Sequence, residues 1–325
     1  MSISSVIGHK KNIKFLLKTI RKDEISHSYI FEGSSGIGKK KVALEISKYI
    51  LCKNATDDSC NICKSCVEFN TLNHSDFMLI EAEGNSIKNE KIEEFQEFIH
   101  IKPNENDKKI VVIDNSELMT ISAQNRILKI LEEPPKYALI ILITARKSSL
   151  VQTIVSRCQS INFNNLLDEE INEFLINNGV DFEKSRIFSK FSNGSIVLAR
   201  KLIDNDNFMN LRDKVMELSN ILIYKKKCEL FDMLKNFEDL KNNQYEILNL
   251  LEIWFRDLLL LSLFDDEKVL FNIDKVDILK KQSKTIEINK LVQCLEFISS
   301  SRNKLEKYVN YALVLEDLFL KIQEV

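Results

Sequence analysis

The sequence feature that most constrains the fold is a glycine-rich loop near the N-terminus. Residues 33–40 read Gly-Ser-Ser-Gly-Ile-Gly-Lys-Lys, between a short apolar run and a helical pattern over residues 42–51. A strand, a glycine loop and a helix in this order are typical of phosphate-binding loops, because glycine lets successive backbone N–H groups face an anion. The helix that follows adds the positive end of its dipole. The loop therefore predicts a nucleotide-binding α/β fold.

The loop departs from the phosphate-binding pattern at its last position. Gly33, Gly38 and Lys39 fit the pattern G-x-x-x-x-G-K-[ST], and Gly36 supplies a further flexible position. The eighth position calls for Ser or Thr, whose hydroxyl binds Mg²⁺, but Lys40 stands there. Its ammonium group brings a positive charge towards the place where the metal would sit. We therefore predict a site that binds ATP weakly or without Mg²⁺ and does not hydrolyse it.

A second departure follows the strand predicted over residues 109–114. This apolar run ends in Asp114, where P-loop proteins place the acid that orients the metal. Many such ATPases have a glutamate directly afterwards to activate water, but the residue here is Asn115. An amide cannot act as a general base. Asp114 can also simply end a buried strand, and the two departures add weight to that alternative.

Four cysteines lie close together after the helix that follows the loop. Their order, Cys52-x₇-Cys60-x₂-Cys63-x₂-Cys66, is typical of a tetrahedral Cys₄ zinc site. The four thiolates fill the coordination shell, so the site should be structural and His74 should not be a ligand. An iron–sulfur cluster or free thiols are the alternatives. No proline follows the last cysteine and no redox-cofactor motif is found elsewhere, which favours zinc.

The order of the predicted elements indicates an α/β domain followed by all-α domains. Strands alternate with helices up to Phe163, which predicts a mostly parallel sheet with helices on both faces. The elements expected here include a helix over residues 6–20, a helix over residues 122–132 capped by Ser122, and a strand over residues 138–144. The remainder is helical, and its richness in Leu, Phe and Ile suits either packing between subunits or a self-contained bundle. The predicted domains are a P-loop domain over 1–165 with a zinc module at 52–66, a three-helix lid over 166–206 and a helical domain over 207–325.

Composition excludes several classes of protein. The 325 residues include 46 Lys and Arg and 48 Asp and Glu, a formal net charge of −2, so any DNA contact must be local or shared with partner subunits. The N-terminus has no signal-peptide pattern, and the densest apolar stretch, residues 247–264, is interrupted by polar and charged residues. We expect a cytoplasmic protein without a membrane span. In that setting Cys158, Cys228 and Cys294 should pack as small hydrophobic residues.

Taken in order, these motifs resemble the AAA+ subunits of bacterial sliding-clamp loaders. A glycine loop alone would be weak evidence, whereas its combination with a Cys₄ insertion and two further motifs is specific. The resemblance spans nearly the whole chain. It is carried by residues 27–33, the glycine loop, the Cys₄ insertion, Asp114, Leu131-Glu132-Glu133-Pro134-Pro135, Thr144, Ser156-Arg157-Cys158, Gly194-Ser195 and the helical pattern of residues 310–320 with Glu316.

The resemblance implies roles that spacing alone does not assign. Arg157 would act as an arginine finger on the ATP of a neighbouring subunit and Ser156 would position it; the alternative is a solvated arginine after a short helix. The arginine that senses nucleotide in this family would fall near Val197 or Leu198, and Arg200 lies one helical turn beyond. The chain's own degenerate nucleotide site would comprise Gly33, Gly36, Gly38, Lys39, Asp114 and Thr144.

The resemblance also implies an assembly. A subunit with a degenerate site would join motor (gamma/tau) subunits and the delta subunit in a hetero-oligomeric ring, held by C-terminal collar domains. Through that complex it would help to load the sliding clamp of DNA polymerase III onto primed DNA, without ATPase activity of its own. One alternative is an ATP-hydrolysing motor subunit of the same loader. Another is a zinc-stabilised ring protein of a different DNA-repair or recombination system.

Overall fold

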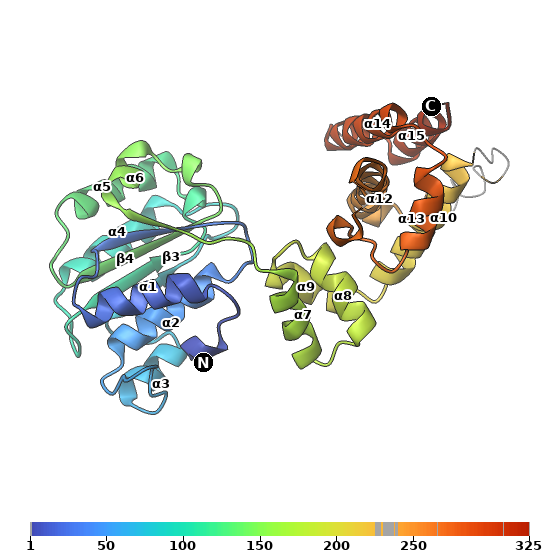
Figure 1. Cartoon of the computed structure of the whole chain (residues 1–325). Helices are drawn as coiled ribbons and strands as arrows, with labels where there is room; N and C mark the ends of the chain where they lie inside the picture. Colours follow the sequence, from blue (N-terminus) through green and yellow to red (C-terminus); the bar gives the residue numbers. More distant parts are fainter. Residues whose placement is uncertain are drawn as a thin grey trace. The chain divides into compact units, whose positions relative to one another are not determined.

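The computed structural model describes residues 2–224, 229, 237, 240–264, 266–307 and 309–324. The chain divides into two compact units, shown in Figure 1. One comprises Met1–Phe182 and Ser192–Arg200, and the other comprises Glu183–Phe191 and Lys201–Val325. Cys228, which we expect to pack as a small hydrophobic residue, lies outside the described residues.

A parallel five-stranded sheet forms the centre of the first unit, as the sequence predicts. Its strands are β1 (Ser28–Glu32), β2 (Phe77–Ile80), β3 (Lys109–Ile113), β4 (Ala138–Thr144) and β5 (Gln159–Asn162). The strand order is β2–β3–β4–β1–β5, and every neighbouring pair is parallel. Because Glu32 pairs with Thr144, and Ile80 with Ile113, the carboxyl ends of neighbouring strands meet at one edge of the sheet.

Helices cover both faces of this sheet (Figure 1). Alternate strand residues point to opposite faces, so Val112 packs in one core and Val111 in the other. The helices around the sheet are α1 (Lys10–Arg21), α2 (Lys39–Leu51), α3 (Lys64–Asn70), α4 (Asn89–His100), α5 (Ile121–Glu132) and α6 (Gln152–Arg157). The helices α1 and α2 pack in the first core, and α4, α5 and α6 pack in the second.

Two predicted helix starts are wrong. The first helix, expected from Val6, begins at Lys10, because Gly8 and His9 have φ angles of 65° and 53°, which are outside the helical region. The helix expected to be capped by Ser122 is capped by Thr120, whose Oγ1 accepts the N–H of Ala123 at 3.2 Å.

The second unit is helical throughout its described part. α12 is its central helix, because it contacts α10, α13 and α14 and buries Trp254 and Phe255. The indole N–H of Trp254 donates to Oε1 of Gln282 at 2.8 Å. Among the described residues, no helix is both long and apolar enough to cross a membrane. The helices are α8 (Phe182–Phe191), α10 (Phe208–Ile223), α12 (Gln244–Phe264), α13 (Val276–Ser283), α14 (Ile288–Glu306) and α15 (Tyr311–Glu324), and α7 (Asp168–Asn177) and the start of α9 (Ile196–Asp204) belong to the first unit.

Candidate nucleotide site, cysteine cluster and exposed arginine

The glycine loop joins β1 to α2 at the carboxyl edge of the sheet, which is where parallel α/β sheets bind ligands. Gly36 and Gly38 have φ angles of 78° and 106°, which residues with a Cβ rarely adopt. A Cβ on Gly36 would lie 2.3 Å from Oγ of Ser195 and 2.9 Å from Cβ of Val197. The start of α9 therefore packs directly on the loop. At its base, Gly33 N–H donates to the Thr144 carbonyl at 3.2 Å.

The ammonium of Lys39 binds the loop itself. Its Nζ donates to the carbonyl oxygens of Gly33 at 2.6 Å and Ser34 at 2.7 Å. Burial lowers the pKa of Lys39, and the nearby carboxylates of Glu117 and Asp114 oppose that shift. These bonds use two of the three N–H donors of the ammonium, so a phosphate would meet the third donor or displace a carbonyl oxygen.

The ammonium of Lys40 lies between two carboxylates. Its Nζ is 2.5 Å from Oε1 of Glu81 and 3.3 Å from Oδ2 of Asp114. Burial acts to lower the pKa of Lys40, but the bond to Glu81 and the charge of Asp114 outweigh it and raise the pKa. Lys40 is therefore a cation at neutral pH. It pairs with Asp114, which stands where metal-binding P-loop sites carry the acid that orients Mg²⁺.

Sequence analysis missed two carboxylates at this site. Glu81 directly follows β2, and the register of β2 with β3 pairs the preceding Ile80 with Ile113, so Glu81 lies beside Asp114. Glu117 accepts the N–H of Ala145 through Oε1 at 3.1 Å, while its Oε2 is buried without a hydrogen-bond partner in the described part of the chain. The position of Glu81 is deducible from the parallel strands, whereas that of Glu117 depends on the turn after β3.

Neither Thr144 nor the residues near the expected nucleotide-sensing arginine direct a positive charge at the glycine loop. Thr144 is fully buried, and its hydroxyl accepts the N–H of Arg146 at 3.0 Å. Val197 donates its backbone N–H to the Gly36 carbonyl at 3.3 Å, but its side chain carries no charge. The guanidinium of Arg200 lies 5.3 Å from the ring centroid of Phe174 in α7. Arg200 is therefore engaged by an aromatic ring.

Arg157 lies at the opposite end of β1 from the glycine loop. Its carbonyl accepts the hydroxyl of Ser28, the first residue of β1, at 3.1 Å. The loop begins after Glu32, the last residue of this five-residue strand. A strand of that length spans roughly 15 Å at about 3.3 Å per residue. Arg157 therefore lies far from the nucleotide site of its own chain.

The Ser156-Arg157-Cys158 segment, called the SRC triplet below, is held in place by a few contacts. Arg157 forms an ion pair with Glu132, from Nη2 to Oε1 at 2.8 Å, and donates through Nη1 to the Thr153 carbonyl at 3.0 Å. Ser156 donates its hydroxyl to the same carbonyl at 3.1 Å. Cys158 is buried in the core beneath α6. The arginine side chain remains 34% exposed, so another molecule can reach it.

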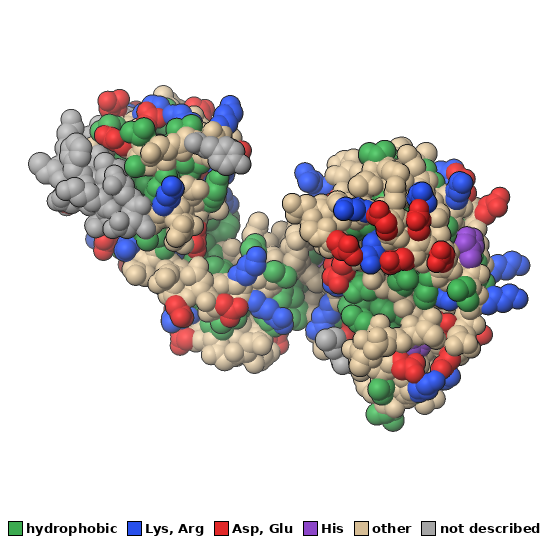
Figure 2. All heavy atoms as spheres, turned by 180° about the vertical axis from the view of Figure 1, so that it is seen from behind, with side chains coloured by type: hydrophobic (Ala, Val, Ile, Leu, Met, Phe, Trp, Pro, Cys, Tyr) green, Lys and Arg blue, Asp and Glu red, His purple; other side chains and the backbone are tan. Residues whose placement is uncertain are grey.

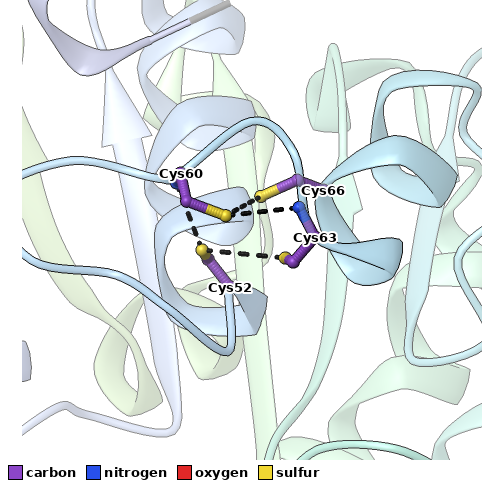
Figure 3. A group of neighbouring side chains, drawn as sticks. All are labelled: Cys52, Cys60, Cys63 and Cys66. Atoms are coloured by element: carbon purple, nitrogen blue, oxygen red, sulfur yellow. Dashed lines mark hydrogen bonds between the residues drawn. The ribbon is translucent and has the colours of Figure 1, made fainter.

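The four cysteines predicted to bind a metal come together in space (Figure 3). Their sulfur atoms lie within 4.8 Å of one another, and the Cys52–Cys63 and Cys60–Cys66 sulfur pairs are each 4.0 Å apart. Four sulfurs about 2.3 Å from one tetrahedral zinc lie about 3.8 Å apart, so the cluster fits that ion closely. Backbone N–H groups of Ile62 and Cys63 lower the pKa of Cys60 to about 6, whereas burial raises the pKa of the Cys52 and Cys66 thiols. Cys60 therefore most readily supplies a thiolate before a metal binds.

Buried polar residues fix the segment that carries these cysteines. His74 accepts the N–H of Asp76 at Nδ1 at 3.0 Å, and its Nε2 lies 2.9 Å from the hydroxyl of Ser65. Ser65 in turn donates to the carbonyl of Leu51 at 2.6 Å. His74 is not among the side chains of the cysteine cluster. Lys48 donates to the side-chain oxygen of Asn70 at 2.7 Å and so ties α2 to α3.

Charged groups are mixed on the surface. On the face shown in Figure 2, Lys and Arg side chains lie among Asp and Glu side chains in both units. The described side chains on this face form no extended basic stripe of the kind that tracks a nucleic-acid backbone. The view agrees with the net charge of −2.

A glycine loop after β1, an acid after β3 and this order of parallel strands define a P-loop domain of the AAA+ class. Residues 8–167 match the family described as "DNA polymerase III, delta subunit", and residues 206–324 match "DNA polymerase III, delta subunit, C terminal". The DNA polymerase III subunit delta' of Bacillus subtilis (strain 168) is 31% identical over 315 residues, covering 96% of this chain and 95% of that protein. The chain belongs to the delta' family of bacterial clamp-loader subunits.

Tau and gamma subunits of DNA polymerase III are also similar to this chain. The DNA polymerase III subunit tau of Bacillus subtilis (strain 168) is 27% identical over 333 residues, which cover 94% of this chain and 58% of tau. The solved structure of a DNA polymerase III gamma subunit-related protein from Thermotoga maritima overlaps with a TM-score of 0.47 at 18% identity, over 95% of this chain and 98% of that one. The match to delta' therefore extends over most of both proteins, whereas the match to tau leaves part of tau uncovered.

Proposed function

We propose that this chain is a subunit of the clamp loader that does not hydrolyse ATP itself and acts on the nucleotide of a neighbour. It would assemble with motor (gamma/tau) subunits and a delta subunit, and the complex would load the sliding clamp onto primed DNA. Residues 1–165 would form the AAA+ domain, 166–206 the lid and 207–325 the collar. Localisation would be cytoplasmic, where replication takes place.

The observation that carries this proposal is the placement of Lys40. Its ammonium pairs with Asp114 at 3.3 Å, the acid that a hydrolysing site would use to orient Mg²⁺. Asn115 follows in the position of the usual glutamate, and the exposed amide cannot take a proton from water. The glycine loop retains the backbone N–H groups and Lys39 for a phosphate. These features favour weak nucleotide binding without turnover.

The second part of the proposal concerns the action of Arg157 on a neighbouring subunit. It is about a strand's length from its own glycine loop, exposed, and part of the SRC triplet. A guanidinium beside a transferring phosphoryl group stabilises the charge that develops there. We propose that Arg157 supplies this charge to a neighbouring subunit's ATP, with Ser156 bound to the turn that presents it.

We also propose that Cys52, Cys60, Cys63 and Cys66 hold one structural zinc ion. The sulfur spacing and the all-sulfur ligand set support this ion. When bound, zinc would stabilise the segment between α2 and β2, because its ligands and its fold form together.

The test of the proposed function uses the isolated full chain and the tagged chain in its own cells. The isolated chain should show no steady-state ATPase activity, and mass spectrometry should recover gamma/tau and delta subunits with the tagged chain. Turnover that Lys39→Ala abolishes would instead identify a motor subunit. Recovery of repair or recombination proteins without any clamp-loader subunit would overturn the assignment altogether.

A further inference from the structure

The backbone at Arg157 is fixed to the sheet. Arg157 is the last residue of α6, and its carbonyl accepts the hydroxyl of Ser28 at 3.1 Å. Ser28 is fully buried and opens β1, which lies between β4 and β5. The point from which the arginine side chain leaves the backbone is therefore defined by the core of the domain.

The guanidinium is fixed by two further contacts on two helices. Nη1 donates to the Thr153 carbonyl within α6 at 3.0 Å, and Nη2 lies 2.8 Å from Oε1 of Glu132, the last residue of α5. Pro134 and Pro135 follow and prevent α5 from continuing, so the Glu132 carboxylate stands at a defined helix end. Because two different nitrogens are held by groups in different directions, the plane of the guanidinium is set as well as its position.

The strength of the ion pair between Glu132 and Arg157 limits the role that Glu132 can have. The side chains of Arg157 and Glu132 are 34% and 49% exposed, and an exposed ion pair changes an equilibrium by no more than about fivefold. An arginine finger changes a rate by about 10³–10⁵-fold in known GTPases. Glu132 therefore cannot withhold Arg157 from a phosphate. Its contribution is of the size needed to restrict the rotamers of a long, flexible side chain.

We propose that Glu132 is a positioning residue for Arg157: it orders the guanidinium before the neighbouring nucleotide arrives. This inference rests on the proposed action of Arg157 on a neighbour. It gives the positioning role to Glu132, the last residue of α5, whereas Glu133 follows the helix as its C-cap. Both side chains are exposed. The two adjacent glutamates thus form a matched pair for an experiment.

The experiment measures the DNA- and clamp-stimulated ATPase of the fully assembled loader. Glu132→Ala should lower kcat by about two- to fivefold, the range of an exposed ion pair, and leave KM for ATP unchanged. Glu132→Gln should lose less, because its amide oxygen still accepts from the guanidinium. Glu133→Ala should match the parent, and Glu132→Ala should have no effect in a loader that already carries Arg157→Ala.

A second measurement uses the isolated chain, so the inference is tested even where a variant assembles poorly. ¹⁵N relaxation of the Arg157 Nε–Hε group should report a restricted side chain in the parent and a more mobile one in Glu132→Ala. Equal mobility in both would overturn the positioning role.

The outcomes separate the inference from the function on which it rests. A normal rate with Arg157→Ala overturns both. A rate lowered by Arg157→Ala but equal for Glu132→Ala and Glu133→Ala overturns only the positioning role. The same holds if Glu132→Ala raises the rate, or still lowers it in the Arg157→Ala loader.

Discussion

The ammonium of Lys40 lies 3.3 Å from the carboxylate of Asp114. Glu81 also pairs with this ammonium, at 2.5 Å. The glycine loop is therefore combined with a lysine that pairs with the acid after β3, the residue type that orients Mg²⁺ in hydrolysing P-loop sites. This arrangement explains how a chain can keep the AAA+ fold while we expect it to have lost turnover.

Lys40→Thr should make nucleotide binding depend on Mg²⁺. We expect the Lys40 ammonium to compete with Mg²⁺ for Asp114 in the native chain, so a fluorescent ATP analogue should bind equally in Mg²⁺ and in EDTA. The variant removes that competitor and adds a hydroxyl ligand. We expect binding in Mg²⁺ to become tighter than in EDTA on the order of tenfold, equivalent to ~1.4 kcal/mol. Hydrolysis should still be absent because Asn115 remains.

Lys41→Thr is the matched control for that experiment. Lys41 carries the same charge on the next residue, but its Nζ donates to the carbonyl of Ser5, away from Asp114. It should leave the Mg²⁺ dependence unchanged. Native binding that already requires Mg²⁺ would refute the competition between Lys40 and the metal.

The cysteine cluster predicts one zinc per chain. Elemental analysis of protein purified without chelator should give a zinc content close to one, and Cys63→Ser should lose the metal. Because metal binding and folding are coupled, protease should then cut the Cys52–Cys66 segment before the rest of the chain. Cys294→Ala, which removes a buried thiol in α14 of the second unit, should retain the zinc. Iron with visible absorption, or no metal, would refute the assignment.

His74 predicts a pH dependence of stability. Burial lowers its pKa in the folded chain, although Asp76 and other nearby acids oppose the shift. The unfolded chain therefore binds more protons once the pH falls below about 6.5, and the stability present above that pH is lost as the pH falls. One such group contributes a slope of at most ~1.4 kcal/mol per pH unit.

His74→Gln should flatten this dependence. Urea unfolding of the native chain and the variant between pH 7.5 and 5 should give free energies of unfolding that converge as the pH falls. Both chains keep the four zinc-site cysteines, so any acid-induced loss of metal affects both. Parallel curves would show that His74 does not supply the slope. His9, whose pKa burial also lowers, should leave a residual slope in the variant.

Much of the first unit could be predicted from its sequence because local pattern and chemistry agree there. β4 begins and ends at the predicted residues 138 and 144, because all seven of its residues are buried and six of them are apolar, which is typical of a central parallel strand. The cysteine cluster was predictable because ligand spacing reflects the geometry of a metal. The place of Lys40 in the loop predicted an ammonium near the expected metal position, and the structure shows this ammonium 3.3 Å from Asp114.

Other features depend on contacts that no local pattern encodes. α1 starts four residues later than predicted, at Lys10 rather than Val6, because the backbone at Gly8 and His9 turns into the left-handed region. The Arg157–Glu132 pair joins two motifs from different helices and required the packing of α5 against α6. Glu81 reached the nucleotide site through the register of β2 with β3.

The central claim is that this chain acts on a neighbour's nucleotide through Arg157, and it is tested most directly in the assembled loader. Arg126→Ala is the control, since Arg126 also forms an exposed ion pair, at 2.6 Å with Glu93. Arg157→Ala should leave zinc content and assembly unchanged while lowering the DNA- and clamp-stimulated ATPase and clamp loading. Arg157→Lys should not restore them fully, because an ammonium lacks the planar fork of donors. A fully assembled Arg157→Ala loader that hydrolyses ATP and loads clamps at the parental rate would contradict the account.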